Sequence, residues 1–551
     1  VLGAAVPMPA LIDRVGSEAT EELLVSGVAT AQLDRVGLAH PLAQEAIRAD
    51  LGAVGANRLL AAMLATPGAI PPLLVIEAVR AHGPERFPPA QVAALAVSAG
   101  EEALRLGDPN LAAELFSQLP VQSVLPVGTN PDPLAGELQA RAALGTGLAK
   151  VAVGETVTAR GHLARAGQAF RTLGQHHGVL RALESYVGML APDSAESQVV
   201  DGHAEWLLAD QVLTPDERVL VRELQSMAPD APDPTERVER LLAECQRAAT
   251  PRAALSAYLG QWRLSHQRGE PAVRRLEIGG HAVTLATQLG ERDRLVRALR
   301  NHIDDLIACG DRDRSLDGLG KLRLVAQKQF HAEARWWCDV MDVGIRLREE
   351  PSVEEILGAT FAAHAAWPQI PAYWRDHIAE LHAFVAMFSA GARAELLPEL
   401  QRMARGSVGQ DLEDRLLDLA VLTLRTDLEP VAPHEVRRAV EGLLATPPGW
   451  RRPAELYLAA RAASAVGDPA PDLVEALQPH ARAWICLGTG AATLGPVSGV
   501  LAALAAVAGD EDLAETLTHD AVMRSTDMHA PSWAEDTRVL VRQARAGRIS
   551  T

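Results

Sequence analysis

The sequence predicts an all-α protein, and more specifically an α-solenoid of antiparallel helix hairpins. Ala, Leu and Arg are abundant while only 4% of residues are aromatic, so helix formers outweigh the residues that large sheets require. Apolar residues recur at helical spacing through most of the 551 residues, and glycine–acid pairs separate the helical segments. At roughly 150 residues per domain this length suggests three or four domains. A repeat array, however, uses such a length for one continuous stack.

Residues 1–70 are expected to form a small winged-helix-like module. Residues 21–28 are predicted to be a short helix, and residues 31–38 a strand pair or wing. Pro41, after His40, suits the first turn of a further helix, because proline lacks only an amide hydrogen that is unpaired there anyway.

Residues 71–551 are predicted to be a continuous series of helices joined by short turns. The first clear helix places Ala93, Val97, Gly100 and Leu104 on one face. It is expected to end at Gly107-Asp108-Pro109, because glycine tolerates a left-handed cap and proline suits a new first turn. In the next helix an alanine is followed one turn later by phenylalanine, a pairing that favours close helix packing.

Pairs of glycine and an acidic residue recur after apolar helix ends, at spacings of about one helix or one hairpin. The pairs begin at Gly107, Gly269, Gly290, Gly310, Gly467 and Gly509. This spacing favours a tetratricopeptide-like solenoid over residues 71–551, although no strict 34-residue period is kept. Proline-rich segments near 120–134, 228–234 and 447–449 are expected to be bends of the solenoid.

Charge and cysteine content restrict the classes of function. The formal net charge of −18 argues against direct nucleic-acid binding by this region. The four cysteines form no C-x-x-C pair and no 18-residue apolar stretch exists, so a reduced, cytoplasmic protein without membrane contact is expected. The start at Val1, without Met or a signal peptide, suggests a fragment of a longer protein.

Sequence templates for nucleotide binding and nucleophilic catalysis fail at identifiable positions. Gly320-Lys321 resembles the end of a Walker A loop, but Ser315 and Leu322 occupy the required Gly and Ser/Thr positions. Gly488-Thr489-Gly490 lacks the third glycine of a dinucleotide loop, and Ser498-Gly499 lacks the first glycine of a nucleophile elbow. We therefore expect no enzyme and no cofactor in this chain.

Histidines and paired carboxylates also give no catalytic or metal signature. His377 and His382 lie five residues apart, about 140° around a helix, which does not bring them to one metal ion. The pairs Asp304-Asp305 and Glu349-Glu350 lie in helical sequence with charged neighbours. We interpret them as solvated helix surface rather than as acid–base catalysts.

Aromatic residues gather in one stretch of an otherwise aromatic-poor chain, and arginines flank them. One interpretation is a ligand or peptide site formed by stacking rings and guanidinium groups; the other is that these large side chains interlock consecutive helices. The candidate binding residues are Arg335, Trp336, Trp337, Trp367, Tyr373, Trp374 and Arg375.

Several segments together resemble a known family. Residues 36–42, VGLAHPL, are similar to the His-containing helix of the winged-helix piece in STAND-type nucleotide-binding regulators. Residues 94–119, with the core AGEEALRLGDPNLAAELF at 99–116, look like the first tetratricopeptide unit after that piece. Residues 298–322 with 334–337 resemble the central repeats. Residues 486–496, continuing through 513–515 to 532–533, resemble the final repeats. The chain thus resembles the C-terminal repeat region of LuxR-type large ATP-binding transcription regulators, a region that nucleotide-cyclase-linked relatives share.

The resemblance implies a sensory, non-catalytic arm of a signal-transduction ATPase. In such proteins the repeats bind a small-molecule effector or a protein partner and restrain the ATPase module of the same protein. ATP is expected only on a separate N-terminal module, since this chain has no P-loop, and DNA binding belongs to another module. The alternative is a peptide- or protein-binding scaffold that has no nucleotide switch.

Overall fold

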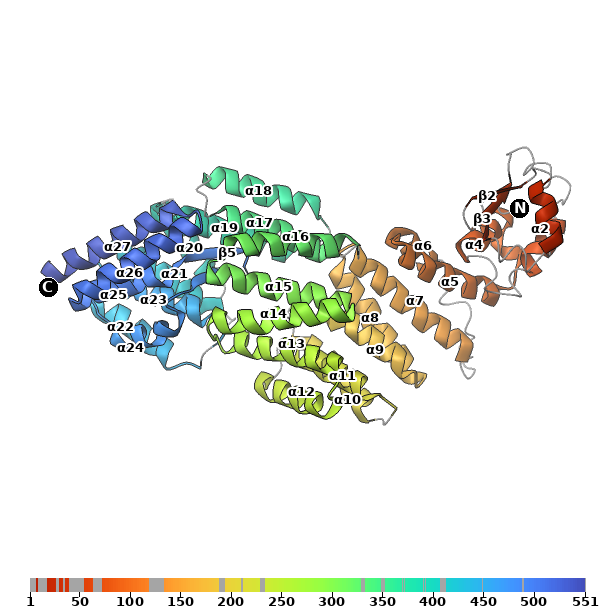
Figure 1. Cartoon of the computed structure of the whole chain (residues 1–551), viewed down its shortest axis with the longest axis horizontal. Helices are drawn as coiled ribbons and strands as arrows, with labels where there is room; N and C mark the ends of the chain where they lie inside the picture. The colour runs from red at the N-terminus through yellow and green to blue at the C-terminus, as the bar shows by residue number, and fades with distance from the viewer. Residues whose placement is uncertain are drawn as a thin grey trace. The chain divides into compact units, whose positions relative to one another are not determined.

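The computed structural model describes residues 6–7, 17–25, 29–32, 35–38, 54–62, 72–117, 133–187, 194–209, 212–227, 233–328, 332–347, 352–368, 370, 372–389, 391, 393–406, 413–447, 449–487 and 490–550. Figure 1 labels the helices and strands along the chain. Contacts between residues divide the chain into two compact units. The first comprises residues 1–213 with 227–230, and the second residues 214–226 with 231–551. This division lies elsewhere than the predicted module boundary at residue 70, so the winged-helix-like module 1–70 remains a prediction.

The first unit begins with a small antiparallel sheet beside a helix. Strands β1 (Val6–Pro7), β2 (Ala29–Gln32) and β3 (Arg35–Leu38) are ordered β1-β3-β2, and helix α2 (Ser17–Val25) contacts β2. The strand pair predicted within residues 31–38 is therefore confirmed, and the helix predicted from residue 21 begins earlier, at Ser17. The expected helix opening at His40-Pro41 lies outside the described residues.

Helices account for the rest of the first unit, and successive helices pack against each other. They are residues 54–62, α4 (Pro72–His82), α5 (Pro89–Leu106), α6 (Pro109–Ser117), α7 (Pro133–Ala152), α8 (Thr156–Thr172), α9 (His176–Val187) and α10 (Ser194–Ala209), with a short 3-10 helix η1 (Pro84–Arg86).

Phe116 of α6 shows how closely these helices approach. Its ring is 2% exposed, and a Cβ added to Gly100 of α5 or Gly145 of α7 would lie 2.7 or 2.2 Å from it. The glycines therefore create the space that the ring fills. Of the predicted face of α5, Ala93, Val97 and Gly100 are buried, and Leu104 packs against the same core while partly exposed.

Helices also form most of the second unit. They are α11 (Pro215–Ser226), α12 (Pro234–Ala248), α13 (Pro251–Gln267), α14 (Ala272–Leu289), α15 (Arg292–Cys309), α16 (Arg312–Lys328), α17 (Ala332–Arg346), α18 (Val353–Ala366), α19 (Ala372–Ser389), α20 (Arg393–Gly406), α21 (Glu413–Leu428), α22 (Pro433–Leu444), α23 (Arg452–Ala465), α24 (Pro471–Leu477), the 3-10 helix η2 (Gln478–His480), α25 (Val497–Ala508), α26 (Glu511–Asp527) and α27 (Pro531–Ser550).

The predicted glycine–acid pairs end helices in both units. All six glycines, at 107, 269, 290, 310, 467 and 509, have a φ between 63° and 82°. In each pair the acidic residue's amide hydrogen bonds back five residues, as from Asp108 to Ala103 and from Asp510 to Ala505. This left-handed closure favours glycine because it has no Cβ. Short closures of this kind return the chain antiparallel, so the predicted all-α solenoid class of helix hairpins is confirmed unit by unit.

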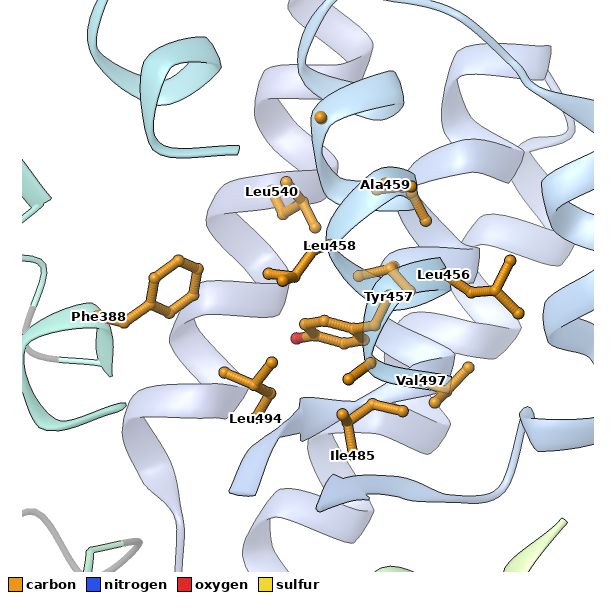
Figure 2. Packing of buried hydrophobic residues seen from close by; sticks show 14 of the residues in the cluster. Phe388, Leu456, Tyr457, Leu458, Ala459, Ile485, Leu494, Val497 and Leu540 are labelled. Carbon is orange, nitrogen blue, oxygen red and sulfur yellow. The ribbon is translucent and has the colours of Figure 1, made fainter. Parts of the chain in front are cut away.

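Two helices near the C-terminus are buried on every side. All residues from Ala454 to Ser464 in α23 and from Val497 to Val507 in α25 are buried. Figure 2 shows Tyr457 and Leu458 of α23 packed among side chains that include Leu540 and Leu494. A helix without a polar face can be accommodated only inside a core, so this part of the unit encloses its central helices instead of leaving one face of each exposed.

A β-hairpin interrupts the helices where the family resemblance implied helical repeats. Strands β4 (Trp484–Leu487) and β5 (Ala492–Pro496) pair antiparallel, with Cys486 opposite Thr493. The hairpin contacts α15, α17, α19 and α23, all of which precede it in the sequence. The expectation of helical repeats at residues 486–496 is therefore wrong, because the alternating strand residues are covered from both sides by helices distant in sequence.

No helix within the described ranges combines the length and hydrophobicity that crossing a membrane requires.

Candidate functional site

The predicted aromatic and arginine residues meet on three successive helices of the second unit. Trp336 and Trp337 of α17 are only 1% and 2% exposed. Trp336 lies 5.0 Å from Trp337 and 6.2 Å from His364 of α18, measured between ring centroids. Trp337 meets Trp374 of α19 edge-on at 6.3 Å. These two buried indoles hold α17, α18 and α19 together, as the second interpretation expects.

A half-buried part of the same cluster reaches the surface. The Arg335 guanidinium lies 4.5 Å from the centroid of the Trp367 ring, within the range of a cation–π contact. The Trp367 Nε1–H donates to Asp339 at 2.9 Å, and Asp339 accepts a long hydrogen bond from Arg323 at 3.5 Å. We call the half-buried residues Arg335, Trp367, Trp374 and Arg375 the α17–α19 surface. The side chain of Tyr373 lies outside the described residues.

A second group of charged residues, around α15, is buried, which was not expected from the sequence. Asp304 and Asp305 are 4% and 0% exposed, so their interpretation as solvated helix surface is wrong. Arg275 of α14 donates to Asp305 at 2.7 Å, and Trp262 of α13 donates to its other oxygen at 2.5 Å. The partners lie 30 and 43 residues away in sequence, which is why local sequence could not reveal them. The companion pair Glu349-Glu350 lies outside the described residues.

Burial also sets the ionisation of these two carboxyl groups. Desolvation raises the pKa of Asp304, and desolvation with the neighbouring Asp304 raises the pKa of Asp305 to about 7, against the opposing effect of Arg275. The Asp304 Oδ1 has no hydrogen-bond partner among the described residues. A Cβ on Gly490, at the tip of the β4–β5 hairpin, would lie 3.3 Å from that oxygen. The hairpin tip thus lies against a carboxyl group whose pKa is raised by burial.

Glu223 of α11 is another buried carboxylate of the second unit, and it contacts two arginines and a serine. It accepts from Arg294 at 3.0 Å, from Arg297 at 2.8 Å and from the Ser256 hydroxyl at 2.6 Å. Arg294 and Arg297 belong to α15 and Ser256 to α13. The Glu223 carboxylate is therefore shared by two guanidinium groups, and each of its two oxygens has a partner.

Arg263 of α13 and Arg300 of α15 are further charged groups on these helices. Burial together with Arg297 and Arg300 lowers the pKa of Arg263 to about 10. Burial lowers the pKa of Arg300 as well, with Glu333 acting in the opposite direction. Both arginines stay charged at neutral pH.

A stack of aromatic rings that includes Trp262 of α13 stays neutral. His266 lies 5.0 Å from Trp262 and 6.1 Å from Trp450, with the rings nearly parallel. Burial and the charges of Arg275, Arg263 and Arg300 lower the pKa of His266 to about 3. The histidine is therefore uncharged at neutral pH.

His382 fastens the hairpin tip to α19. Its Nε2 lies 2.8 Å from the Ala491 carbonyl oxygen and its Nδ1 2.8 Å from the Thr360 hydroxyl. A carbonyl only accepts, so Nε2 carries the proton. The Thr360 hydroxyl beside Nδ1 also contacts the Ile356 carbonyl oxygen at 2.8 Å. Burial lowers the pKa of His382 to about 4. This buried histidine is a structural link and not a metal ligand paired with His377.

The residues that partly matched the nucleotide-binding and nucleophile templates lie on or next to helices and in the β4–β5 hairpin. Lys321 is on α16, its side chain 63% exposed and paired with Asp317. Ser498 is buried at the start of α25. Gly490 ends the turn of the antiparallel hairpin, while Gly488 and Thr489 lie outside the described residues. Across the described ranges, no three His, Cys, Asp or Glu side chains are grouped as a metal site.

No protein-family model and no curated protein matches this sequence. The chain is similar to the crystal structure of the APC/C hetero-tetramer Cut9–Hcn1 over 93% of its length and 92% of that chain, with 12% identity and a TM-score of 0.42.

It is also similar to a STAND protein with a tetratricopeptide repeat sensor from Pyrococcus horikoshii. That match covers 78% of this chain and 58% of that chain, with 10% identity and a TM-score of 0.25.

Proposed function

We propose that this chain is a non-catalytic sensory arm of an ATP-dependent signal-transduction protein, in the class of transcriptional regulators. It binds a protein partner or an effector, and the ATPase module of the same full-length protein is the partner that its signal reaches. Support for the wider regulator context comes from the sequence resemblance at residues 36–42, 99–116 and 298–322. ATP itself belongs to that other module.

The observation that carries the binding role is the α17–α19 surface. Trp and Arg are the residues that dominate binding energy at protein interfaces. Here Trp367 is held between Arg335 and Asp339, so its position is set before a partner arrives. Preorganisation of this kind lowers the entropic cost of binding. Phe361, which is 58% exposed, adds an apolar ring to the surface of α18, the helix that Trp367 follows.

Signalling would follow from different affinities of the partner for two arrangements of the helices. A ligand shifts a conformational equilibrium only by the difference between its affinities for the two states. Because the buried Trp336 and Trp337 link α17 to α18 and α19, a change at the surface residues is transmitted to the packing beneath them. The coupling is reciprocal, so a partner that favours one state also changes the affinity for the effector.

The test starts from the gene. We expect an in-frame P-loop upstream of the codon for Val1; a start codon directly before Val1 would contradict the regulator context. The encoded ATPase module is then titrated with residues 1–551 by calorimetry. The double variant Arg335→Ala/Trp367→Ala should bind about tenfold more weakly or worse, as expected for loss of two hot-spot side chains.

A control on the same helix separates binding from general damage. Arg346 of α17 is 62% exposed and, among the described residues, pairs with Asp342 one turn away, so Arg346→Ala should leave the affinity unchanged. Equal affinities for the double variant, the control and the unaltered protein would remove the α17–α19 surface from the proposal.

A further inference from the structure

The turn of the β4–β5 hairpin lies in close contact with three helices that are far away in the sequence. A Cβ added to Gly490 would lie 3.3 Å from the Oδ1 of Asp304 on α15. The carbonyl oxygen of the next residue, Ala491, lies 2.8 Å from the Nε2 of His382 on α19. A Cβ added to Gly344 of α17 would lie 2.0 Å from that same oxygen. The turn is therefore seated against α15, α17 and α19 at once.

One of these contacts places the turn against a carboxyl oxygen that has no partner. Asp304 is only 4% exposed, and its Oδ1 makes no hydrogen bond among the described residues. The Arg275 guanidinium of α14 is engaged elsewhere, because it donates to Asp305 at 2.7 Å and to the Glu270 carbonyl oxygen at 2.5 Å. A buried acceptor without a partner costs free energy, and the cost is much larger for an ionised carboxylate than for a neutral carboxyl group.

The side chains that meet the turn beside Asp304 are apolar. Ile307 of α15 and Met341 of α17 each lie 3.3 Å from the Cβ position of Gly490, as the Asp304 oxygen does, and neither supplies a hydrogen bond. Desolvation raises the pKa of Asp304, while two arginines act in the opposite direction. The charged and titratable groups around this carboxyl group and the turn are Arg275 of α14, Arg300, Asp305 and Cys309 of α15, Cys486 of β4 and His382 of α19.

We propose that the β4–β5 hairpin is a pH-sensitive latch. It is seated against α15, α17 and α19 while the Asp304 carboxyl group is neutral, and it loosens when that group gives its proton to water and ionises. An ionised Asp304 beneath the seated turn has glycine backbone and apolar side chains beside its Oδ1. Movement of the turn away from α15 admits water to this oxygen and so compensates the charge.

The direction of the pH dependence follows from the burial of Asp304. Because the pKa of this group is raised above 3.8 in the seated state, the seated hairpin holds a proton that the released carboxyl group gives up. Seating therefore weakens as the pH rises above 3.8 and becomes constant once the pH exceeds the raised pKa. His382 acts in the opposite direction, since burial lowers its pKa from 6.5 to about 4 and its protonation disfavours seating at acid pH.

Hydrogen exchange of the hairpin amides in residues 1–551 tests the latch. Protection of the peptides that span residues 484–496 is measured from pH 4.5 to 8.5, after correction for the intrinsic pH dependence of exchange. Asp304→Asn keeps the shape of the side chain but does not ionise, so its hairpin should be better protected than that of the unaltered protein. We expect the gap to grow with pH and to reach about tenfold or more at the alkaline end, the effect of one unpaired buried charge. The contribution of His382 is common to both proteins and cancels in this comparison.

Two further variants separate ionisation from a structural role. Asp304→Leu removes the unpaired oxygen altogether and should protect the hairpin at least as well as Asp304→Asn. Asp317→Asn on α16 removes a carboxyl group that is 65% exposed and paired with Lys321, and it should behave like the unaltered protein. If Asp304 instead supports the hairpin, both of its variants lose protection at every pH, which would overturn the proposal. A gap that does not change with pH, or the same gap in Asp317→Asn, would overturn it as well.

The latch also reaches the α17–α19 surface, and this step rests on the proposed function. Strand β5 contacts α17 and α19, the helices that carry Arg335 and Arg375. We expect the affinity of the ATPase module for the unaltered protein to fall as the pH rises, and its affinity for Asp304→Asn to fall less. If neither protein binds the module, the proposed function is contradicted, while the exchange data still decide on the latch. Equal pH dependence of binding in both proteins would remove the link between the latch and the surface.

Discussion

Individual buried side chains of the second unit depend on partners far away in the sequence. Asp305 is held by Arg275 and Trp262, Glu223 by two arginines of α15, and His382 by the carbonyl of Ala491. Each of these groups looks like an ordinary polar residue of a helix when its own sequence neighbourhood is considered. Burial raises the pKa of Asp305 and lowers that of His382.

The buried histidines predict how stability depends on pH. The pKa values of His382 and His480 are lowered to about 4 and that of His266 to about 3. Unfolding returns each to its ordinary value of 6.5, so below that pH the unfolded chain takes up protons that the folded chain does not. The free energy of unfolding should therefore fall as the pH drops from 6.5 toward 4, by about 1.4 kcal/mol per pH unit for each such histidine.

The variant His382→Gln tests this for one residue. The glutamine amide can still donate to the Ala491 carbonyl, but it does not titrate. Denaturant unfolding at a series of pH values gives the free energy of unfolding as a function of pH. Between pH 6.5 and 4 its slope should be smaller for the variant than for the unaltered protein, by the contribution of one histidine. Asp304 and Asp305 act in the opposite direction, since their raised pKa makes the folded state hold protons, but they are common to both proteins. Identical slopes would show that His382 titrates normally in the fold.

Among the secondary-structure elements, the β4–β5 hairpin determines how the central helices of the second unit come together. It contacts α15, α17, α19 and α23, and its turn approaches the helices very closely. A Cβ added to Gly344 of α17 would lie 2.0 Å from the Ala491 carbonyl oxygen, the same atom that accepts from His382. The absence of a side chain at residue 344 is therefore a condition for seating the hairpin.

Gly344→Ala should destabilise the protein by about 1–3 kcal/mol or more, because backbone must move to admit the methyl group. The control is Gly358→Ala on α18, where nothing lies within 4 Å of the added Cβ. Alanine is the better helix former, so that variant should gain about 0.5–1 kcal/mol. Urea unfolding of the two variants measures both effects. A stable Gly344→Ala protein would mean that the hairpin tip does not sit against α17.

The whole chain is organised as two units with separate cores. Leu115 lies in the core formed by α4, α5, α6 and α7 of the first unit, and Leu504 in the core around α23 and α25 of the second. Both side chains are fully buried. Proteins with more than one core commonly unfold in more than one step, so calorimetry should resolve two transitions.

Matched substitutions assign the two transitions. Leu115→Ala and Leu504→Ala should each cost about 2–5 kcal/mol, the usual effect of a cavity left by leucine. Leu115→Ala is expected to lower the melting temperature of one transition and Leu504→Ala that of the other. If either substitution moves all of the unfolding heat together, the two units unfold as one cooperative body.

Local features of the fold could be predicted well from the sequence. The glycine–acid pairs located six helix ends because a left-handed cap depends on a single residue and its neighbour. The spacing of Ala93, Val97 and Gly100 identified a buried helix face for the same reason: helical geometry relates residues three and four apart. The aromatic cluster was also recognised, and two of its tryptophans proved to be core residues.

The candidate sites were harder to predict because they combine residues from separate helices. The arginines at 294, 297 and 300 are conspicuous in the sequence. Nothing in the neighbouring sequence shows that Arg294 and Arg297 share Glu223 or that Arg263 of α13 interacts with Arg297 and Arg300. The hairpin was missed because β4 and β5 are short, and because strands buried on both faces lack the alternation that marks an exposed strand.

The sequence by itself determined the helical class, the positions of many helix ends and the absence of an intact P-loop, since each depends on contacts within a few residues. Only the tertiary structure decided which charges are buried together, where the chain divides into units, and that a hairpin sits among the helices. Those outcomes depend on desolvation and on packing between segments tens to hundreds of residues apart, and neither quantity is encoded in any short stretch of the chain.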